Sequence, residues 1–224
     1  PPTGERTRLE SGALGQWDLS LQEQVIRVHD YDGNAWDYYS LQKKPAHGEP
    51  TRLLLFLHGF PEFAAAWERE LAHFGESVHA VAIDLKGHHY SSAPAEVDEY
   101  NFIELGWEMR AIIQCLGYGS ATVVGHDFGA AMAWTLGMLH PDVVDGLLIM
   151  HAPHPYLFGR ALLDPDSDQV ERIQYMLYAR GTTLQDQLNF TRIIFSDFSI
   201  FNSDFYRGKR ILRLMLENWL PLNR

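Results

Sequence analysis

Hydrophobic residues gather in short runs that are separated by longer segments of mixed polarity. The segment Val25–Gln42 alternates apolar and polar positions on both sides of an Asp-Gly-Asn tripeptide, which predicts two strands joined by a tight turn. Leu53–His58 is almost continuously apolar, the pattern of a strand that is covered on both faces. Three further runs of this kind follow, at His79–Ile83, Ala121–Val124 and Val144–Met150.

Segments with a helical pattern separate these runs, at Trp67–Phe74, Phe102–Leu116 and Phe128–Leu139. Regular alternation of buried strands and helices predicts an α/β fold with a mostly parallel sheet flanked by helices. We assign residues 1–155 to this core. Residues 156–224 contain several helix-like segments and no convincing central strand, so we expect a helical cap or lid there.

Composition narrows the class of partner. With 224 residues, 46% of them hydrophobic, the chain can bury one sizeable core. Its net charge of −11 disfavours nucleic acid and anionic membrane surfaces, so we expect a small neutral or apolar molecule instead. The single cysteine, Cys115, excludes an internal disulfide and is compatible with a reducing compartment. Because we find neither a membrane-spanning stretch nor a secretory signal, we expect a cytoplasmic protein.

Two loops follow predicted strands and carry reactive residues. In open α/β sheets such groups gather at the carboxyl ends of the strands. The loop HGFPE, residues 58–62, leaves the first apolar run, and GHDFG, residues 125–129, leaves the run ATVV. GHDFG has the small-x-nucleophile-x-small form of a sharp strand-to-helix elbow, with Asp127 in the position usually given to serine.

An aspartate at such an elbow is a candidate nucleophile. The start of the following helix favours its ionised form, and with a reference pKa of about 3.9 it needs no base before it attacks an electrophilic carbon. The alternative is that Asp127 simply caps the helix. The HGFPE loop favours the nucleophile, because it is the natural source of a partner amide that stabilises negative charge.

Together, HGFPE, the DLKG stretch at residues 84–87 and GHDFG resemble the α/β-hydrolase-fold epoxide hydrolases. The resemblance is strong over about residues 50–160 and looser beyond. It implies that Asp127 opens the epoxide through a covalent ester, without metal or organic cofactor. It also implies that the backbone amides of Phe60 and Phe128 form the oxyanion hole. We expect a small apolar epoxide as substrate.

Tyrosines of the cap complete the site in this family, where two of them donate hydrogen bonds to the epoxide oxygen. In IQYMLYARG the resemblance assigns this role to Tyr175, while Tyr178 remains an open choice for the second donor. A phenol, with a pKa of about 10, stays protonated at neutral pH and can still share its proton with an alkoxide. Both could instead be ordinary packing aromatics of the lid.

Four further residues are expected to line the cleft, namely His58, Pro61, His151 and His154. We expect His58 to brace the oxyanion loop through a hydrogen bond rather than to transfer protons. His151 cannot act as the acidic partner that some relatives place near its position. His88 and His89 lack a third ligand for a metal, so no metal site is predicted.

Haloalkane dehalogenation uses the same aspartate elbow and is the second candidate activity. Haloalkane dehalogenases usually carry side-chain donors after HG and after the nucleophile, where this chain has Phe60 and Phe128. Epoxide opening is therefore the better match. A ligand-binding relative without catalysis is the third alternative, because no histidine follows His154 and the resemblance implies a late histidine that hydrolyses the ester. We favour the explanation that the chain is a fragment of a longer protein. If the fragment stood alone, we would expect self-association, because an incomplete sheet exposes apolar surface.

Overall fold

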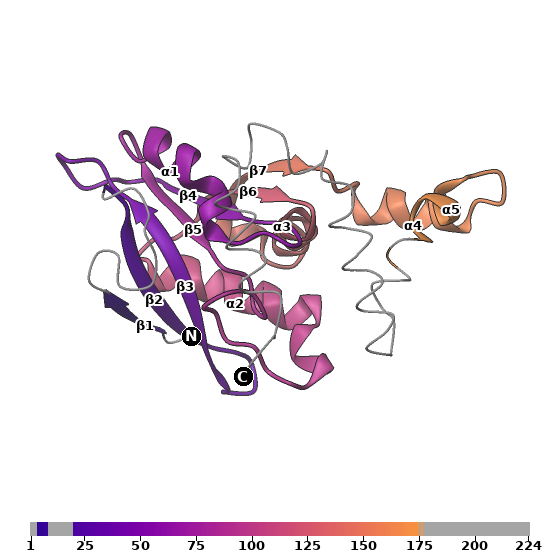
Figure 1. The fold of residues 1–224 in the computed structure, drawn as a ribbon, viewed down its shortest axis with the longest axis horizontal. Helices are drawn as coiled ribbons and strands as arrows, with labels where there is room; N and C mark the ends of the chain where they lie inside the picture. Colours follow the sequence, from indigo (N-terminus) through magenta and orange to yellow (C-terminus); the bar gives the residue numbers. More distant parts are fainter. Residues whose placement is uncertain (1–3, 9–19, 175, 177–224) are drawn as a thin grey trace, which may run out of the picture. The chain divides into compact units, whose positions relative to one another are not determined.

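A seven-stranded sheet forms the centre of the computed structural model, which describes residues 4–8, 20–174 and 176. The chain divides into two compact units, Pro1–Ala152 and Pro153–Arg224. The strands lie in the first unit and are β1 (Gly4–Arg8), β2 (Gln22–His29), β3 (Ala35–Lys43), β4 (Leu53–Leu57), β5 (His79–Ile83), β6 (Ala121–His126) and β7 (Val144–Met150). Their order across the sheet is β1-β2-β3-β5-β4-β6-β7 (Figure 1).

The first three strands are antiparallel, as the alternating pattern predicts for β2 and β3. Val25 pairs with Tyr39 in this hairpin, and the turn contains Gly33 at a φ of 89°, a conformation that glycine adopts without a steric penalty. Strand β3 then pairs antiparallel with β5, and β1 pairs with β2. The predicted hairpin is confirmed, whereas β1 was not predicted.

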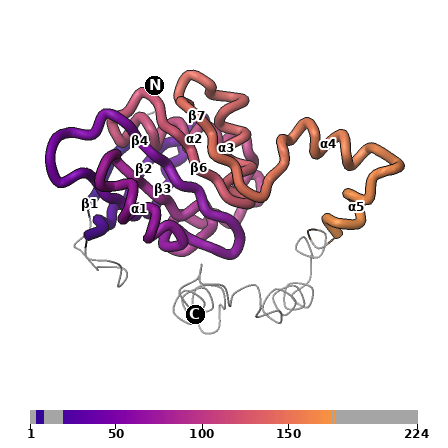
Figure 2. The backbone as a smooth tube through the Cα atoms, turned by 90° about the horizontal axis from the view of Figure 1, so that it is seen from above, coloured from indigo at the N-terminus to yellow at the C-terminus, as the bar shows by residue number. Residues whose placement is uncertain are grey.

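The other strands, β5, β4, β6 and β7, run parallel to one another. They alternate with helices along the chain (Figure 1), and Figure 2 shows the chain from above. Leu57, the last residue of β4, pairs with both Ile83 and Gly125. The residues that follow these positions therefore meet at one edge of the sheet. This register brings the HGFPE loop, the DLKG stretch and the GHDFG elbow together.

Helices cover both faces of this sheet. The α-helices of the first unit are α1 (Glu68–Phe74), α2 (Phe102–Cys115) and α3 (Phe128–Leu139), and the 3-10 turns are η1 (Ala64–Trp67), η2 (Val97–Tyr100) and η3 (Pro141–Val143). Leu55 and Leu57 lie in the core that α2 and α3 complete, whereas Phe56 between them contacts Trp67 and Phe74 of η1 and α1. This alternation explains why β4 is apolar at every position.

A buried charged cluster joins α2 to the sheet. The carboxylate of Glu108 accepts hydrogen bonds from the Lys86 ammonium and the Tyr38 hydroxyl, and all three residues are buried. The Lys86 ammonium also lies 4.2 Å from the centre of the Trp36 ring. Burial raises the pKa of Glu108, and the hydrogen bonds from Lys86 and Tyr38 oppose that rise. The cluster therefore satisfies an otherwise costly buried charge.

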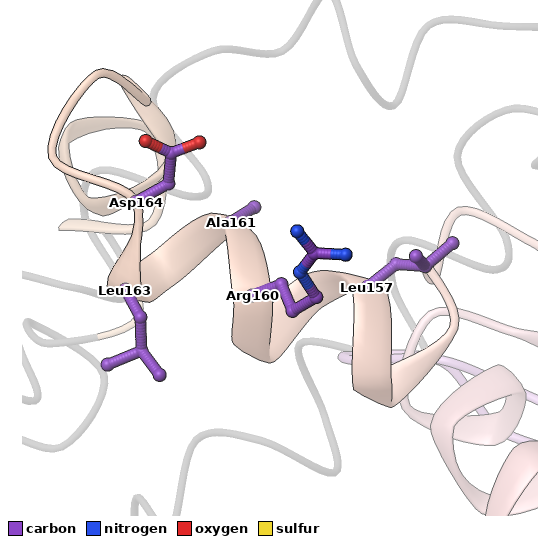
Figure 3. A pocket seen from close by; sticks show the side chains of 5 residues that line it. All are labelled: Leu157, Arg160, Ala161, Leu163 and Asp164. Carbon is purple, nitrogen blue, oxygen red and sulfur yellow. The ribbon is translucent and has the colours of Figure 1, made fainter.

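The described part of the second unit contains two helices, α4 (Pro155–Leu163) and α5 (Gln169–Arg172). An open hollow lies along α4 and is lined by Leu157, Arg160, Ala161, Leu163 and Asp164 (Figure 3). Among the predicted site residues that the structure describes, none lines it. The boundary after residue 155 and the role of this segment as a lid remain predictions. Over the described residues, every helix is too short or too polar to traverse a lipid bilayer.

Candidate active site

Asp127 forms the sharp turn between β6 and α3. It is the single residue between the two elements, and its backbone has φ 53° and ψ −117°, a conformation that is uncommon for a residue other than glycine. Its amide donates to the carbonyl of Met150 at 3.0 Å, and its own carbonyl accepts from Ala130 and Ala131. The strained backbone is therefore held on both sides by hydrogen bonds.

The glycines of GHDFG allow this turn to pack closely against β4. A Cβ atom at Gly125 would lie 2.4 Å from the carbonyl oxygen of Gly129. A Cβ atom at Gly129 would lie 2.2 Å from the carbonyl oxygen of Leu57. Both distances are far below van der Waals contact, so each position requires glycine. This close packing explains why the GHDFG segment has glycine at both ends.

The carboxylate of Asp127 points to the HGFPE loop. Its Oδ1 atom accepts a hydrogen bond from the Phe60 amide at 3.1 Å. Asp127 occupies the position before α3, but its side chain makes no capping hydrogen bond to that helix. The helix-cap alternative is therefore wrong. The side chain is only partly buried, which leaves it on the surface formed by the two loops.

The HGFPE loop is braced from within. The Gly59 amide donates to Oε2 of Glu62 at 3.1 Å, and the Glu62 amide donates back to the Gly59 carbonyl at 2.8 Å. Glu62 is only 2% exposed. Pro61 is buried and follows a cis peptide bond. These contacts fix the loop that directs the Phe60 amide toward Asp127.

Phe128 is the first residue of α3 and follows Asp127 directly. Its side chain is 53% exposed, and its amide belongs to the first turn of the helix, where backbone amides have no partner within the helix. Of the two residues predicted to form the oxyanion hole, Phe60 donates a hydrogen bond from its amide to the Asp127 carboxylate, and Phe128 follows Asp127 in the sequence.

His58 lies beneath the loop and is fully buried. The Leu85 amide donates to its Nε2 atom at 2.9 Å, and its Nδ1 atom lies 2.9 Å from the Gly59 carbonyl, so we assign the neutral tautomer with the proton on Nδ1. Burial, followed by the nearby imidazole of His88, holds the pKa of His58 well below its usual range. This histidine braces the loop and carries no charge.

His126 connects the loop to the end of β7. Its Nδ1 atom lies 3.2 Å from Oε2 of Glu62, and its Nε2 atom lies 3.2 Å from Nδ1 of His151. The hydrogen bond with Glu62 raises the pKa of His126; the negative charges of Glu62 and Asp127 add to that effect, and burial opposes it. His151 is exposed and has a φ of 56°. A protonated imidazole at position 126 would lie between two carboxylates.

Six of the eight predicted site residues lie in the first unit, and the structure brings these six together. Asp127, Phe60, Phe128, Pro61 and His58 belong to the two facing loops, and His151 joins them through His126. His154 belongs to the second unit, where its Nδ1 atom accepts a hydrogen bond from the Tyr156 amide at 3.2 Å. Tyr175 lies outside the described residues.

Two residues of this region had no predicted role. Glu62 organises the loop and contacts His126, and the only signal for it in the sequence is its place at the end of HGFPE. Asp84 follows β5 directly and is fully buried, which its position at the carboxyl end of a strand could have indicated. Among the described residues, no three histidine, cysteine or acidic side chains are grouped as a metal site would require.

The sharp turn at Asp127, the Phe60 amide that faces it and the order of the strands are typical of one class of protein. The alpha/beta hydrolase fold family matches residues 52–206, and the chain belongs to this family. Asp127 lies at the position from which α/β hydrolases present their nucleophile.

Several curated relatives of the chain are named epoxide hydrolases. Epoxide hydrolase 1 of Caenorhabditis elegans is 34% identical over 176 residues, which are 75% of this chain and 43% of that protein. Epoxide hydrolase 3 of Xenopus tropicalis is 42% identical over 115 residues, 51% of this chain and 31% of that protein. The chain therefore spans less than half the length of these curated relatives.

Solved structures agree with the sequence relatives. An epoxide hydrolase from Bacillus megaterium, crystallised with an inhibitor, superposes with a TM-score of 0.71 at 31% identity, covering 82% of this chain and 64% of that one. An epoxide hydrolase from an endophytic Streptomyces superposes with a TM-score of 0.53 at 28% identity, covering 66% and 44%. The resemblance drawn from the three motifs is confirmed.

Proposed function

We propose that this chain opens epoxides by alkylation of Asp127, as part of an epoxide hydrolase that yields vicinal diols. The observation that carries the proposal is the 3.1 Å hydrogen bond from the Phe60 amide to Oδ1 of Asp127. It fixes one oxygen of a bare carboxylate in the position where negative charge is stabilised, at a helix start and next to a loop amide. The names of the relatives and of the solved structures support the choice of epoxides.

The hydrogen bond also assigns different roles to the two carboxylate oxygens. Oδ1, held by Phe60, becomes the carbonyl oxygen of the ester. Oδ2 attacks a ring carbon; a C–O bond forms there while the C–O bond of the strained ring breaks. The ring oxygen leaves as an alkoxide and takes a proton from an acid, a role that we propose for Tyr175. The product of this step is a β-hydroxy ester on Asp127.

Release of the diol requires water to attack the ester carbon. The tetrahedral intermediate then carries its negative charge on Oδ1, facing the Phe60 amide, with the Phe128 amide as the second proposed donor. The proton of the attacking water must pass to a base. His58 is unsuited to that role because it is buried and its Nε2 atom already accepts from the Leu85 amide.

No metal or organic cofactor takes part in the proposed steps. The partner is a small apolar epoxide, and the net charge of −11 argues against nucleic acid or an anionic membrane surface as a ligand. A cytoplasmic location, supported by the single cysteine, and self-association belong to the same proposal.

Intact-mass spectrometry of the purified chain tests the proposal. The protein is incubated with styrene oxide or with a haloalkane, quenched in acid to trap the ester, and digested to map the modified residue. We expect one adduct, on Asp127 and with the epoxide only, and none with Asp127→Asn. An adduct formed from the haloalkane with loss of halide would favour dehalogenation instead. If several epoxides leave no mark on Asp127, a ligand-binding role replaces catalysis.

A further inference from the structure

The residues that directly follow β5 contact both ends of the oxyanion loop, which comprises the HGFPE segment and its continuation to Ala64. At the beginning of the loop, the Leu85 amide donates to Nε2 of His58. At its end, the Ala64 amide donates to Oδ1 of Asp84 at 2.7 Å, a short bond to a fully buried carboxylate. Asp84 and Leu85 therefore hold the two ends of the segment that contains the Phe60 amide.

His89 in turn holds Asp84. Its Nδ1 atom lies 2.7 Å from Oδ2 of Asp84, and the side chains are 3% and 0% exposed. The Tyr90 amide donates to the same oxygen at 3.3 Å. The His89 ring also lies 4.7 Å, between ring centres, from Phe63, which precedes Ala64. His89 thus contacts the end of the loop directly and through Asp84.

His89 makes these contacts from a strained backbone. Its φ of 47° lies in the left-handed region, where a histidine is disfavoured relative to glycine. Strain of this kind persists where surrounding contacts determine it, and it gathers at functional sites. A glycine at position 89 would relieve the strain and lose the hydrogen bond to Asp84. The His89 side chain must therefore make a contact that offsets the strain of the backbone.

We infer that Asp84 and His89 are positioning residues for epoxide opening: the His89 hydrogen bond fixes the Asp84 carboxylate, which fixes the Ala64 amide and so the direction of the Phe60 amide. This inference rests on the proposed function for its effect on rate. Neither residue touches the reacting atoms. Loss of the His89 bond should slow ester formation and leave the binding of the epoxide unchanged.

Two substitutions at position 89 separate the hydrogen bond from the turn. Both glycine and asparagine accept a left-handed backbone, but only asparagine places an N–H donor near the position of the histidine Nδ1. The rate constant for the Asp127 adduct and the half-saturating concentration of styrene oxide are measured for the full chain, His89→Gly and His89→Asn. We expect His89→Gly to lower the rate constant at least threefold at an unchanged half-saturating concentration, and His89→Asn to retain the wild-type rate.

A smaller decrease in His89→Gly, an equal decrease in both variants, or a change in the half-saturating concentration alone would overturn the inference. Thermal unfolding serves as the control: rates and exchange are compared at a temperature at which the wild type and both variants are folded, because His89→Gly also removes the hydrogen bond to the buried Asp84 carboxylate. Hydrogen exchange of the peptide covering residues 58–66 provides a readout that needs no epoxide. Exchange there should be at least threefold faster in His89→Gly than in His89→Asn. If the wild type forms no adduct, the proposed function fails, and this exchange ratio alone decides the positioning role.

Discussion

Gly59→Ala directly tests whether the facing amide and carboxylate act together. Gly59 lies outside the left-handed region, so alanine changes only the space that is filled. Its Cβ atom would lie 2.5 Å from Cβ of Asp127, whereas ordinary contacts lie at 3.4–4 Å. The two segments must therefore separate by about 1 Å, which would stretch the 3.1 Å bond between Phe60 and Asp127 to about 4 Å, beyond hydrogen-bonding distance.

The loss of this hydrogen bond should change the rate of adduct formation on Asp127. The Phe60 amide orients the Asp127 carboxylate for attack, and a misplacement of about 1 Å can cost about 10²-fold in rate, so adduct formation should slow by about 10- to 100-fold. Acid-quenched intact mass measures the rate, and Gly146→Ala is the matched control because its nearest new contact is Thr122 Cγ2 at 4.0 Å. If Gly59→Ala alkylates within threefold of the wild type while Gly146→Ala is unchanged, the Phe60 amide does not assist the step.

Three further predictions concern the cap, the buried charges and pH. Tyr175→Phe should slow adduct formation about tenfold or more, since positioned acids contribute about 10²- to 10⁴-fold, and an unchanged rate would remove it from the site. Lys86→Met should lower the free energy of unfolding in urea by about 3–5 kcal/mol by leaving Glu108 buried without its cation, and adding Glu108→Leu should restore most of the loss. Burial, with smaller effects from Lys44 and Arg6, lowers the pKa of His79 to about 3. Between about pH 6.5 and pH 3, the unfolded chain therefore binds a proton that the folded chain does not. As the pH is lowered through this range, the free energy of unfolding should decrease by about 1.4 kcal/mol per pH unit more in the wild type than in His79→Gln. Equal slopes for the two proteins would contradict this prediction.

Much of the first unit could be predicted because buried strands and helices impose different spacings on apolar residues. The bounds of β5, β7 and α3 match the predicted ranges, and β4 and β6 differ by one or two residues at the end. The geometry of the elbow was also predictable. GHDFG contains both Asp127 and the two glycines that the sharp turn requires, so the signal lies within one short segment.

Features that depend on contacts between segments far apart in the sequence could not be predicted from it. Strand β1 has the sequence GERTR, and all five residues are exposed. It therefore lacks the apolar pattern that reveals a strand, and its pairing with β2 depends on backbone hydrogen bonds. The hydrogen bond between Asp84 and Ala64 joins residues that are 20 positions apart. Its donor is a backbone amide, which nearly every residue has, so the residue type at position 64 gives no sign of it. Only the register of β4 and β5 shows that these groups meet.

The strained residues of the described part of the chain tie these observations together. Three residues other than glycine have a left-handed φ there, and each follows a parallel strand at the same edge of the sheet: His89 after β5, Asp127 after β6 and His151 after β7. Such a backbone costs on the order of 1 kcal/mol or more per residue, which glycine would avoid. In each case the side chain makes a contact that glycine could not, to Asp84, to the Phe60 amide and to His126 respectively. At each of these positions the side chain therefore holds a specific group at this edge of the sheet, and a glycine in the same backbone conformation would remove that contact.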